Sequence, residues 1–545
     1  MLTIYGNDTI VFRMKKIFKQ RHRAFLGLVL IVVLVSLTAC NLPGEQIGAA
    51  TQTAVIPQQT LTANLSPPTA TASQTVEMLI EPTLIGSATA ENPTQEPSPT
   101  QEPSPTQPII PEGYIKYFSQ SGDTLPVVAA HFGTQVDEIL TFASLPAGNF
   151  LPVGSVLAVP DVLITDAPYP EPALPDSEVI YGPGSIDFDP ITFAAQAGGF
   201  LTRYTEEVYG DIYMGPEIVQ MVALESSSNP RLLLAFLEFR SNWVFGEPAG
   251  AEEDEYPIGF GALLSKGLYK ELMISARMLA QGYYGWRDGT LHELSFYDGS
   301  SAAISPDLNA GTVAIQALFA SLFGQDLWKD ALYGENGFLV YYQQNFGDPW
   351  ARAEEFEPLL NADVRQPELA LPFLPGLRWS LTGGPHIAWQ TGTPRGALDF
   401  APVTGESVCQ VSVAWATAAA PGLVVRSARG VVALDLDGDG DEGTGWVLIY
   451  LHIAEADRAQ VGEWLGLDGL IGHPSCERGQ STGTHVHFVR KYNGEWIAAE
   501  GALPLILDGW QAFAGEGRYE GFLSKGEQIV TASPIGIQGS SIFRE

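Results

Sequence analysis

Four histidines and one aspartate in the C-terminal part of the chain are of the types that hold and use a catalytic zinc ion. They are His386 in GGPH, Asp399 in ALDFAP, His452 in YLH, and His485 and His487 in STGTHVHF. The whole chain of 545 residues has only 8 histidines. A catalytic zinc keeps three protein ligands from histidine and carboxylate side chains, with water in the fourth position. The set therefore suffices for a zinc site with two further imidazoles beside it.

The spacing of His485 and His487 indicates how one imidazole binds metal while another acts next to it. Two residues apart on a strand, their side chains face the same side. A second strand that carries His452 brings another imidazole to the metal-bound water. Zinc lowers the pKa of that water and polarises a peptide carbonyl, while the imidazoles move protons and stabilise the oxyanion. This chemistry is hydrolysis of a peptide bond.

The order of these residues resembles the lysostaphin/LytM-type metallopeptidases. Most members have the first histidine four residues before the aspartate, a position occupied here by Arg395. A subgroup similar to staphylolytic and β-lytic endopeptidases spaces them thirteen apart within GG-x-H, and here 399 − 386 = 13. The resemblance covers about 376–500. It implies that His386, Asp399 and His487 are the Zn²⁺ ligands and that His452 and His485 are catalytic.

The same resemblance implies an antiparallel β fold with an open groove that cleaves peptidoglycan cross-bridge peptides, often at glycine. Cys476 lies nine residues before His485, where the subgroup also has a cysteine. A disulfide to Cys409, on a strand predicted over 408–413, would clamp the loop that leads to HVH. Two separate buried thiols are the alternative, because spacing does not show that the sulfurs meet.

The elements that must position these residues are short β-type runs between turns rich in glycine and aspartate. An antiparallel sheet is expected from the runs 408–413, 422–427, 431–436, 446–452 and 485–492. The acidic turn 435–442 is either an exposed hairpin tip or a calcium loop. It fails the EF-hand pattern, since Trp446 takes the twelfth place from Asp435.

A mainly helical domain is predicted before the sheet. Apolar residues recur at helical spacing over 217–224, 232–237, 268–279 and 310–323. The stretch 229–243 is similar to lysozyme-like glycosidases and lytic transglycosylases, with Glu238 near the end of an apolar helix as a speculative glycan-cleaving acid. Glu225 is a rival carboxylate. The alternative is a structural or substrate-positioning domain without this activity.

Residues 113–161 are predicted to form a small βααβ unit. SGDTL, a helix carrying HFG and the closing LPVGSVLAVP make it similar to a LysM module. The resemblance implies binding of N-acetylglucosamine-containing glycans such as peptidoglycan. Phe142-Ala143-Ser144 stands where an asparagine is usual, so a spacer module without glycan binding is the alternative.

The N-terminus predicts export and anchoring. A basic stretch, MKKIFKQRHR, precedes an apolar run that is short for a membrane-spanning helix and ends in Leu37-Thr38-Ala39-Cys40. This resembles a bacterial lipobox, which implies cleavage before Cys40 and lipid attachment to it. An uncleaved signal anchor is the alternative, and either places the later residues outside the cytoplasmic membrane.

Composition excludes one large class of partner. The formal net charge is −34, which repels nucleic acid. The predicted organisation is a signal peptide (1–39), a disordered Thr/Pro/Ser-rich linker (40–112), the LysM module (113–161), a Pro-rich linker (162–185), the helical domain (186–370), the metallopeptidase domain (371–515) and a tail (516–545). We expect a lipid-anchored peptidoglycan endopeptidase. The rival is a wall-binding or regulatory lipoprotein that keeps the fold without turnover.

Overall fold

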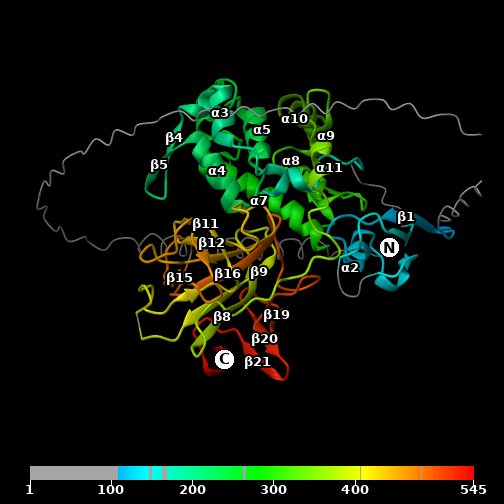
Figure 1. Ribbon diagram of the computed structural model, residues 1–545. Coiled ribbons are helices and arrows are strands. Elements are labelled where there is room, and N and C mark those ends of the chain that lie inside the picture. Colours follow the sequence, from blue (N-terminus) through cyan, green and yellow to red (C-terminus); the bar gives the residue numbers. More distant parts are fainter. Residues whose placement is uncertain (1–107, 146–149, 162–168, 262–264, 406, 480) are drawn as a thin grey trace, which may run out of the picture. The chain divides into compact units, whose positions relative to one another are not determined.

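The structure is a computed structural model that describes residues 108–145, 150–161, 169–261, 265–405, 407–479 and 481–545. The predicted signal peptide, Cys40 and nearly all of the first linker lie outside these residues. Everything described belongs to one compact unit, Gln101–Glu545. Along the chain it comprises an N-terminal module (108–161), a helical region (186–359) and a sheet region (369–545) (Figure 1).

None of the helices in the described part of the chain combines the length and the apolar character needed to cross a bilayer.

The N-terminal module is a three-stranded sheet with one helix. It comprises β1 (Tyr114–Phe118), α2 (Leu125–His131), a 3₁₀ turn (Val136–Glu138), β2 (Leu140–Thr141) and β3 (Val156–Pro160), with sheet order β1-β3-β2. Val128 and Leu157 are fully buried at its centre. The second predicted helix is only the 3₁₀ turn, because Leu140 already pairs with Ala158 of β3.

The helical region confirms the predicted helical middle of the chain. Its helices are α3 (Pro190–Ala197), α4 (Gly215–Ser226), α5 (Pro230–Ser241), α6 (Ala251–Glu255), α7 (Leu268–Arg287), α8 (Ala310–Ala320), α9 (Gln325–Tyr333), α10 (Phe338–Phe346) and α11 (Pro349–Phe356), and its hairpins are β4 (Thr205–Val208) with β5 (Asp211–Met214) and β6 (Glu293–Ser295) with β7 (Ser301–Ala303). Local chemistry sets the ends. At α5, the Asn229 side chain accepts a hydrogen bond from the Arg231 N–H (2.9 Å) and Pro230 occupies the first turn.

The prediction that 162–185 is a linker is wrong for its described part, residues 169–185. Leu174 and Glu178 are buried there. The Glu178 carboxylate pairs with Arg352 of α11 at 2.8 Å, and the Ala173 N–H donates to the Thr312 hydroxyl of α8 at 2.7 Å. The prolines made this segment look like a tether, but its apolar and charged side chains find partners across α8 and α11.

The sheet region confirms the antiparallel prediction. Its nine-stranded sheet has the order β14-β11-β12-β13-β16-β9-β8-β22, with β17 beside β16. The strands are β8 (Arg378–Ile387), β9 (Arg395–Pro402), β11 (Gly422–Ala428), β12 (Val431–Asp435), β13 (Trp446–Leu451), β14 (Trp464–Leu465), β16 (Val486–Tyr492), β17 (Glu495–Trp496) and β22 (Ser541–Phe543). Smaller sheets comprise β10 (Ala416–Thr417) with β15 (Leu470–Gly472), and β18 (Ile506–Leu507), β19 (Trp510–Ala514), β20 (Gly521–Lys525) and β21 (Gln528–Thr531).

Two predictions about the sheet region are wrong. Residues 408–413 form a loop, in which Cys409 has a left-handed backbone (φ 61°) and Val408 and Val413 are exposed. Residues 516–545 are no tail outside the domain: β20 and β21 extend the four-stranded sheet, and β22 pairs with β8. Ile542 is fully buried there, so this segment belongs to the core.

One face of the large sheet carries the helices. Val447 and Ile449 of β13 pack in the same hydrophobic core as α4 and α7, whereas Leu448 and Tyr450 belong to the core on the opposite face. Strand alternation explains this division. Figure 1 shows α4 and α7 next to β11 and β12. The helical region and the sheet region therefore share one core.

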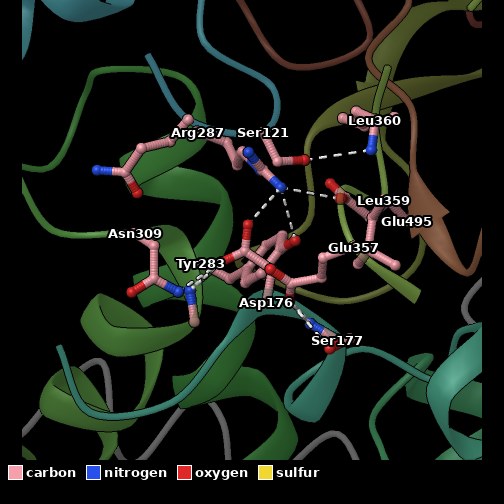
Figure 2. A network of polar contacts seen from close by, with 12 residues as sticks. Ser121, Asp176, Ser177, Tyr283, Arg287, Asn309, Glu357, Leu359, Leu360 and Glu495 are labelled. Carbon is pink, nitrogen blue, oxygen red and sulfur yellow. Dashed lines mark hydrogen bonds and ion pairs between the residues drawn. The ribbon is translucent and has the colours of Figure 1, made fainter. Parts of the chain in front are cut away.

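A buried arginine joins the regions. Arg287, the last residue of α7, lies 2.9 Å from Asp176, 3.0 Å from Glu495 of β17 and 3.0 Å from the Tyr283 hydroxyl (Figure 2). Beside it, the Ser121 hydroxyl of the N-terminal module accepts the Leu360 N–H at 3.2 Å. One guanidinium thus neutralises carboxylates from two distant segments of the chain.

Arg287→Met should destabilise the protein by about 3–5 kcal/mol, because it leaves two buried carboxylates without their cation. Urea unfolding at neutral pH measures the loss. Arg203→Met is the matched control, since Arg203 pairs with Glu247 at an exposed site and should cost at most about 1 kcal/mol. Equal losses in the two variants would contradict the role assigned to Arg287.

Glu357 makes this junction sensitive to pH. Burial, together with nearby Asp176, raises the pKa of Glu357 to about 7. The folded state then binds more protons than the unfolded state between about pH 4.3 and 7, so stability falls as pH rises through that window. Glu357→Gln should flatten this fall in urea midpoints, whereas the exposed-site control Glu354→Gln should leave it unchanged. An unaltered slope in Glu357→Gln would refute the assignment.

Candidate metal centre

Three strands bring His386, Asp399 and His487 together. His386 comes from β8, Asp399 from β9 and His487 from β16. His487 and Asp399 are direct cross-strand partners, and β8 is irregular on either side of Gly383 and His386. All three side chains are at least nine-tenths buried. We call these three residues the metal centre.

The separations of the candidate ligand atoms fit a zinc ion. His386 Nε2 lies 3.1 Å from His487 Nδ1 and 3.4 Å from Asp399 Oδ1, and the last two atoms are 3.3 Å apart. Tetrahedral bonds of about 2.0–2.1 Å require ligand atoms about 3.3–3.4 Å from one another. Asp399 Oδ1 is buried and forms no hydrogen bond within the described part of the chain. A cation is the partner that this arrangement lacks.

In both imidazoles, the ring nitrogen that is not a candidate ligand atom is hydrogen-bonded to a backbone carbonyl. His386 Nδ1 lies 2.9 Å from the Gly384 carbonyl, and His487 Nε2 lies 2.8 Å from the Ala388 carbonyl. A ring nitrogen that donates to a carbonyl leaves the other nitrogen with its lone pair for the metal. Burial acts to raise the pKa of Asp399, but the neighbouring imidazoles, His386 first, hold it well below its usual range. Asp399 is therefore ionised and ready to bind a cation.

The glycine pair before His386 has a steric reason. A Cβ on Gly383 would lie 2.5 Å from Asp399 Oδ2, and one on Gly384 would lie 2.6 Å from the Glu520 carbonyl. Both distances are too short for a Cβ atom. The two glycines therefore leave room for the Asp399 side chain and for the segment that follows β19. The two glycines of the motif are thus explained by packing.

His452 and His485 lie beside the metal centre. His452 directly follows β13, and its Nδ1 lies 3.0 Å from the Glu477 carbonyl. His485 directly precedes β16, with Nδ1 at 2.7 Å from the Gly483 carbonyl and Nε2 at 3.6 Å from Asp399 Oδ1. The two ring centroids are 4.6 Å apart. Both imidazoles thus have their Nδ1 engaged by backbone and their Nε2 available for proton transfer.

Burial, followed by the neighbouring His485, lowers the pKa of His452 to about 4. The imidazole is therefore neutral at physiological pH. A neutral imidazole with a free Nε2 accepts a proton, as a general base must.

A cavity of about 450 Å³ adjoins the metal centre. Asp399 and His485 line it from the sheet, and Arg518, Tyr519 and Glu520 line it from the segment between β19 and β20. The Tyr519 ring also packs on His386, with centroids 4.5 Å apart. The part of the cavity lining formed by residues 518–520 was not predicted from the sequence. The alternation over 510–514 and 521–531 was the signal that could have revealed it.

Arg395 has a structural position four residues before Asp399. Its guanidinium donates to the carbonyls of Pro385 (3.0 Å), Gly515 (2.8 Å) and Gly517 (3.1 Å). It therefore fastens the 515–517 segment next to His386. The residue that would mark a dead site under the four-residue spacing supports the cavity wall instead.

A disulfide joins the loops on one side of the cavity. Cys409 and Cys476 are bonded, with Cα atoms 5.0 Å apart. The Thr484 hydroxyl also donates to the Gln410 carbonyl at 2.7 Å. The loop that leads to His485 is thus tied to the 407–415 loop.

The carboxylates suspected of glycan cleavage have inward partners. Glu238 Oε2 accepts the N–H groups of Val244 (2.6 Å) and Phe245 (3.0 Å), which closes the turn after α5. Glu225 accepts the Tyr269 hydroxyl at 2.8 Å and lies 2.5 Å from the Arg478 guanidinium. Through these contacts, both carboxylates stabilise the fold.

The acidic turn at 435–442 forms hydrogen bonds within itself. Asp435 accepts the N–H groups of Asp437, Gly438 and Gly440. The carboxylates of Asp435, Asp437 and Asp439 lie close enough together to share an ion.

Comparison with known proteins gives a family match that covers the helical region. A family model described as LasA, N-terminal domain, matches residues 172–359. The curated Protease LasA of Pseudomonas aeruginosa is 27% identical over 305 residues, 51% of this chain and 66% of the relative. The chain thus spans just under two thirds of that relative.

Solved structures match parts of the chain with low TM-scores. One titled M23 metalloprotease pseudoalterin from the deep sea is 22% identical, with 31% of this chain and 96% of that chain covered and a TM-score of 0.26. The catalytic domain of lysostaphin from Staphylococcus simulans is 20% identical, with 23% and 89% covered and a TM-score of 0.17.

Asp399→Asn should abolish stable zinc binding, because an amide oxygen replaces the one anionic ligand. Zinc content per chain, measured by mass spectrometry of the metal after dialysis, should fall from about one to near zero. His473→Ala is the control, since His473 packs on Trp415 and bonds the Ala414 carbonyl. Full zinc retention by folded Asp399→Asn would show that this residue is not a ligand.

Proposed function

We propose that this chain is a zinc-dependent endopeptidase that hydrolyses peptide bonds of peptidoglycan. The observation that carries the proposal is the 3.1–3.4 Å triangle of His386, Asp399 and His487 with His452 and His485 beside it. A zinc ion bound there would supply a Lewis acid and an activated water. The name of the curated relative, Protease LasA, supports the same chemistry.

The two further histidines perform the proton transfers. His452, neutral because of burial, takes a proton from the attacking water at Nε2 and can return it to the leaving amine. His485 lies next to Asp399. Because its Nδ1 donates to the Gly483 carbonyl, its Nε2 donates a hydrogen bond to the carbonyl oxygen, as negative charge develops there, in the form of the ring that carries protons on both nitrogens. Their Nδ1 bonds to Glu477 and Gly483 hold both rings in position.

The direction of substrate entry follows from the sheet. His487 is two residues from Val489, and Asp399 is two residues from Ala397. Val489 and Ala397 belong to the core shared with the helices, so all four side chains face the same side. The helical region covers that face beyond the metal centre. A peptide therefore approaches from the cavity lined by His485 and Tyr519.

The proposal includes targeting to the cell wall. The N-terminal module has a three-stranded sheet and one α-helix, with a 3₁₀ turn in place of the second helix of a βααβ unit. From the resemblance of its sequence to a LysM module, we propose that it binds peptidoglycan glycan. Cys40 is proposed to carry lipid that anchors the protein outside the cytoplasmic membrane. A binder linked to a cutter raises the effective substrate concentration without new contacts.

The rival is a wall-binding protein without turnover. The completeness of the constellation favours the enzyme, because a binding role needs neither histidine beside the metal centre. Bound zinc without activity on any peptidoglycan would favour the rival.

Purified protein should release new amino termini from isolated peptidoglycan, seen by mass analysis of muropeptides. A chelator should abolish the activity and added zinc should restore it. His485→Ala should lower kcat about 10²–10⁴-fold while zinc content stays at one per chain, and His473→Ala should retain activity. New reducing sugar ends in place of amino termini would refute the proposal.

A further inference from the structure

Glu225 connects the helical region to the surroundings of His452. It is the penultimate residue of α4 and is only 2% exposed. Its Oε1 lies 2.5 Å from an Arg478 nitrogen and 3.7 Å from an Arg429 nitrogen, and its Oε2 accepts the Tyr269 hydroxyl. One buried carboxylate of the helical region thus faces two arginines of the sheet region.

The two arginines lie in the two loops that hold His452. Arg429 precedes Gly430, whose carbonyl accepts the Ile453 N–H at 3.0 Å. Arg478 follows Glu477, whose carbonyl accepts from His452 Nδ1. The Ser475 N–H of the same loop donates to the His452 carbonyl at 2.7 Å. The two loops therefore form hydrogen bonds with the backbone and the ring of His452 and with the backbone of Ile453.

These loops need an external support. His452, Arg429 and Arg478 all have left-handed backbone conformations, with φ of 66°, 47° and 60°. Side chains other than glycine rarely adopt this region, and it persists only where the surroundings hold it. The Arg478 side chain is 8% exposed and packs over Tyr209 and Trp389, while the Arg429 guanidinium donates a hydrogen bond to the Tyr213 hydroxyl at 2.8 Å.

We propose that Glu225 is a positioning residue for His452. By drawing Arg429 and Arg478 towards α4, it fixes the two loops and keeps the Glu477 carbonyl where it orients the His452 ring. The proposal rests on the endopeptidase function and gives the helical region a part in it. It also assigns Glu225 a role other than glycan cleavage.

The chemistry predicts a specific defect. Glu225→Gln keeps the shape but removes the negative charge opposite Arg478, whose side chain is 8% exposed, and opposite the partly exposed Arg429, so the loops relax and His452 loses its orientation. Misplacement of a catalytic group by about 1 Å costs about 10²-fold in rate. The expected loss is therefore ten- to hundredfold in kcat, with KM within about twofold, since Glu225 does not line the cavity next to the metal centre.

The matched control is Glu495→Gln. Glu495 is equally buried and also forms an ion pair between the two regions, with Arg287 at 3.0 Å (Figure 2), but its strand does not hold His452. It should lose stability as Glu225→Gln does while kcat stays within about twofold. The double variant Glu225→Gln, Arg478→Met should be no slower than Glu225→Gln alone, because the pair acts as one unit.

A second readout works without turnover. Carbethoxylation of His452 by diethyl pyrocarbonate, followed by mass spectrometry, should be faster in full-length Glu225→Gln than in wild type or Glu495→Gln. If Glu225→Gln does not fold, Arg478→Lys tests the same contact. Equal kcat and equal labelling in Glu225→Gln and Glu495→Gln would overturn the proposal. Wild type that labels as expected but cuts no peptidoglycan would refute the endopeptidase function and leave the positioning role supported.

Discussion

The two-residue repeat of the central strands constrains everything else in the sheet region. On β9 and β16, the residues that pack against helices and the residues of the metal centre necessarily share a face. The change from core to polar site falls between Ala397 and Asp399 on one strand and between His487 and Val489 on the other. A one-residue slip would turn both candidate ligands, Asp399 and His487, into the opposite core. The apolar packing thus secures the register that the metal centre requires.

The sequence predicted the parts of the site that are local. The HVH pattern, GGPH and the spacing to Asp399 are readable because each depends on a few neighbouring residues, and the structure brings those side chains together. The helical middle and the antiparallel sheet were equally accessible, since apolar periodicity carries them. Cys409 was misplaced on a strand because the valines around it imitate strand alternation while the backbone turns left-handed.

The contributions from distant segments could not be predicted. Tyr519 reaches His386 from a glycine-rich stretch that resembled a tail, and Leu174 is buried in a stretch that resembled a linker. Glu225 drew attention only as a possible acid, because its arginine partners lie more than 200 residues away in the sequence, at 429 and 478. Such pairs depend on tertiary packing, and no local pattern marks them.

Scarce positive charge is placed where it organises the fold. The chain has 28 lysines and arginines against 62 acidic residues, yet several arginines are buried among carboxylates. Arg287 joins Asp176 to Glu495, and Arg426 pairs with Glu442 at 2.6 Å. Each removes repulsion at a point where acidic segments converge. At these two contacts, a buried cation thus offsets the charge of the carboxylates around it.

The pairing of β22 with β8 also has a consequence for the order of synthesis. Residues 541–543 complete the free edge of the strand that carries His386, yet the ribosome adds them 541 − 386 = 155 residues after that histidine. Until they emerge, β8 has only β9 as a paired strand in the large sheet. A nascent chain therefore contains all five candidate site residues well before the sheet that positions them is complete. The free edge of β8 is therefore closed only after residues 541–543 have been added to the chain.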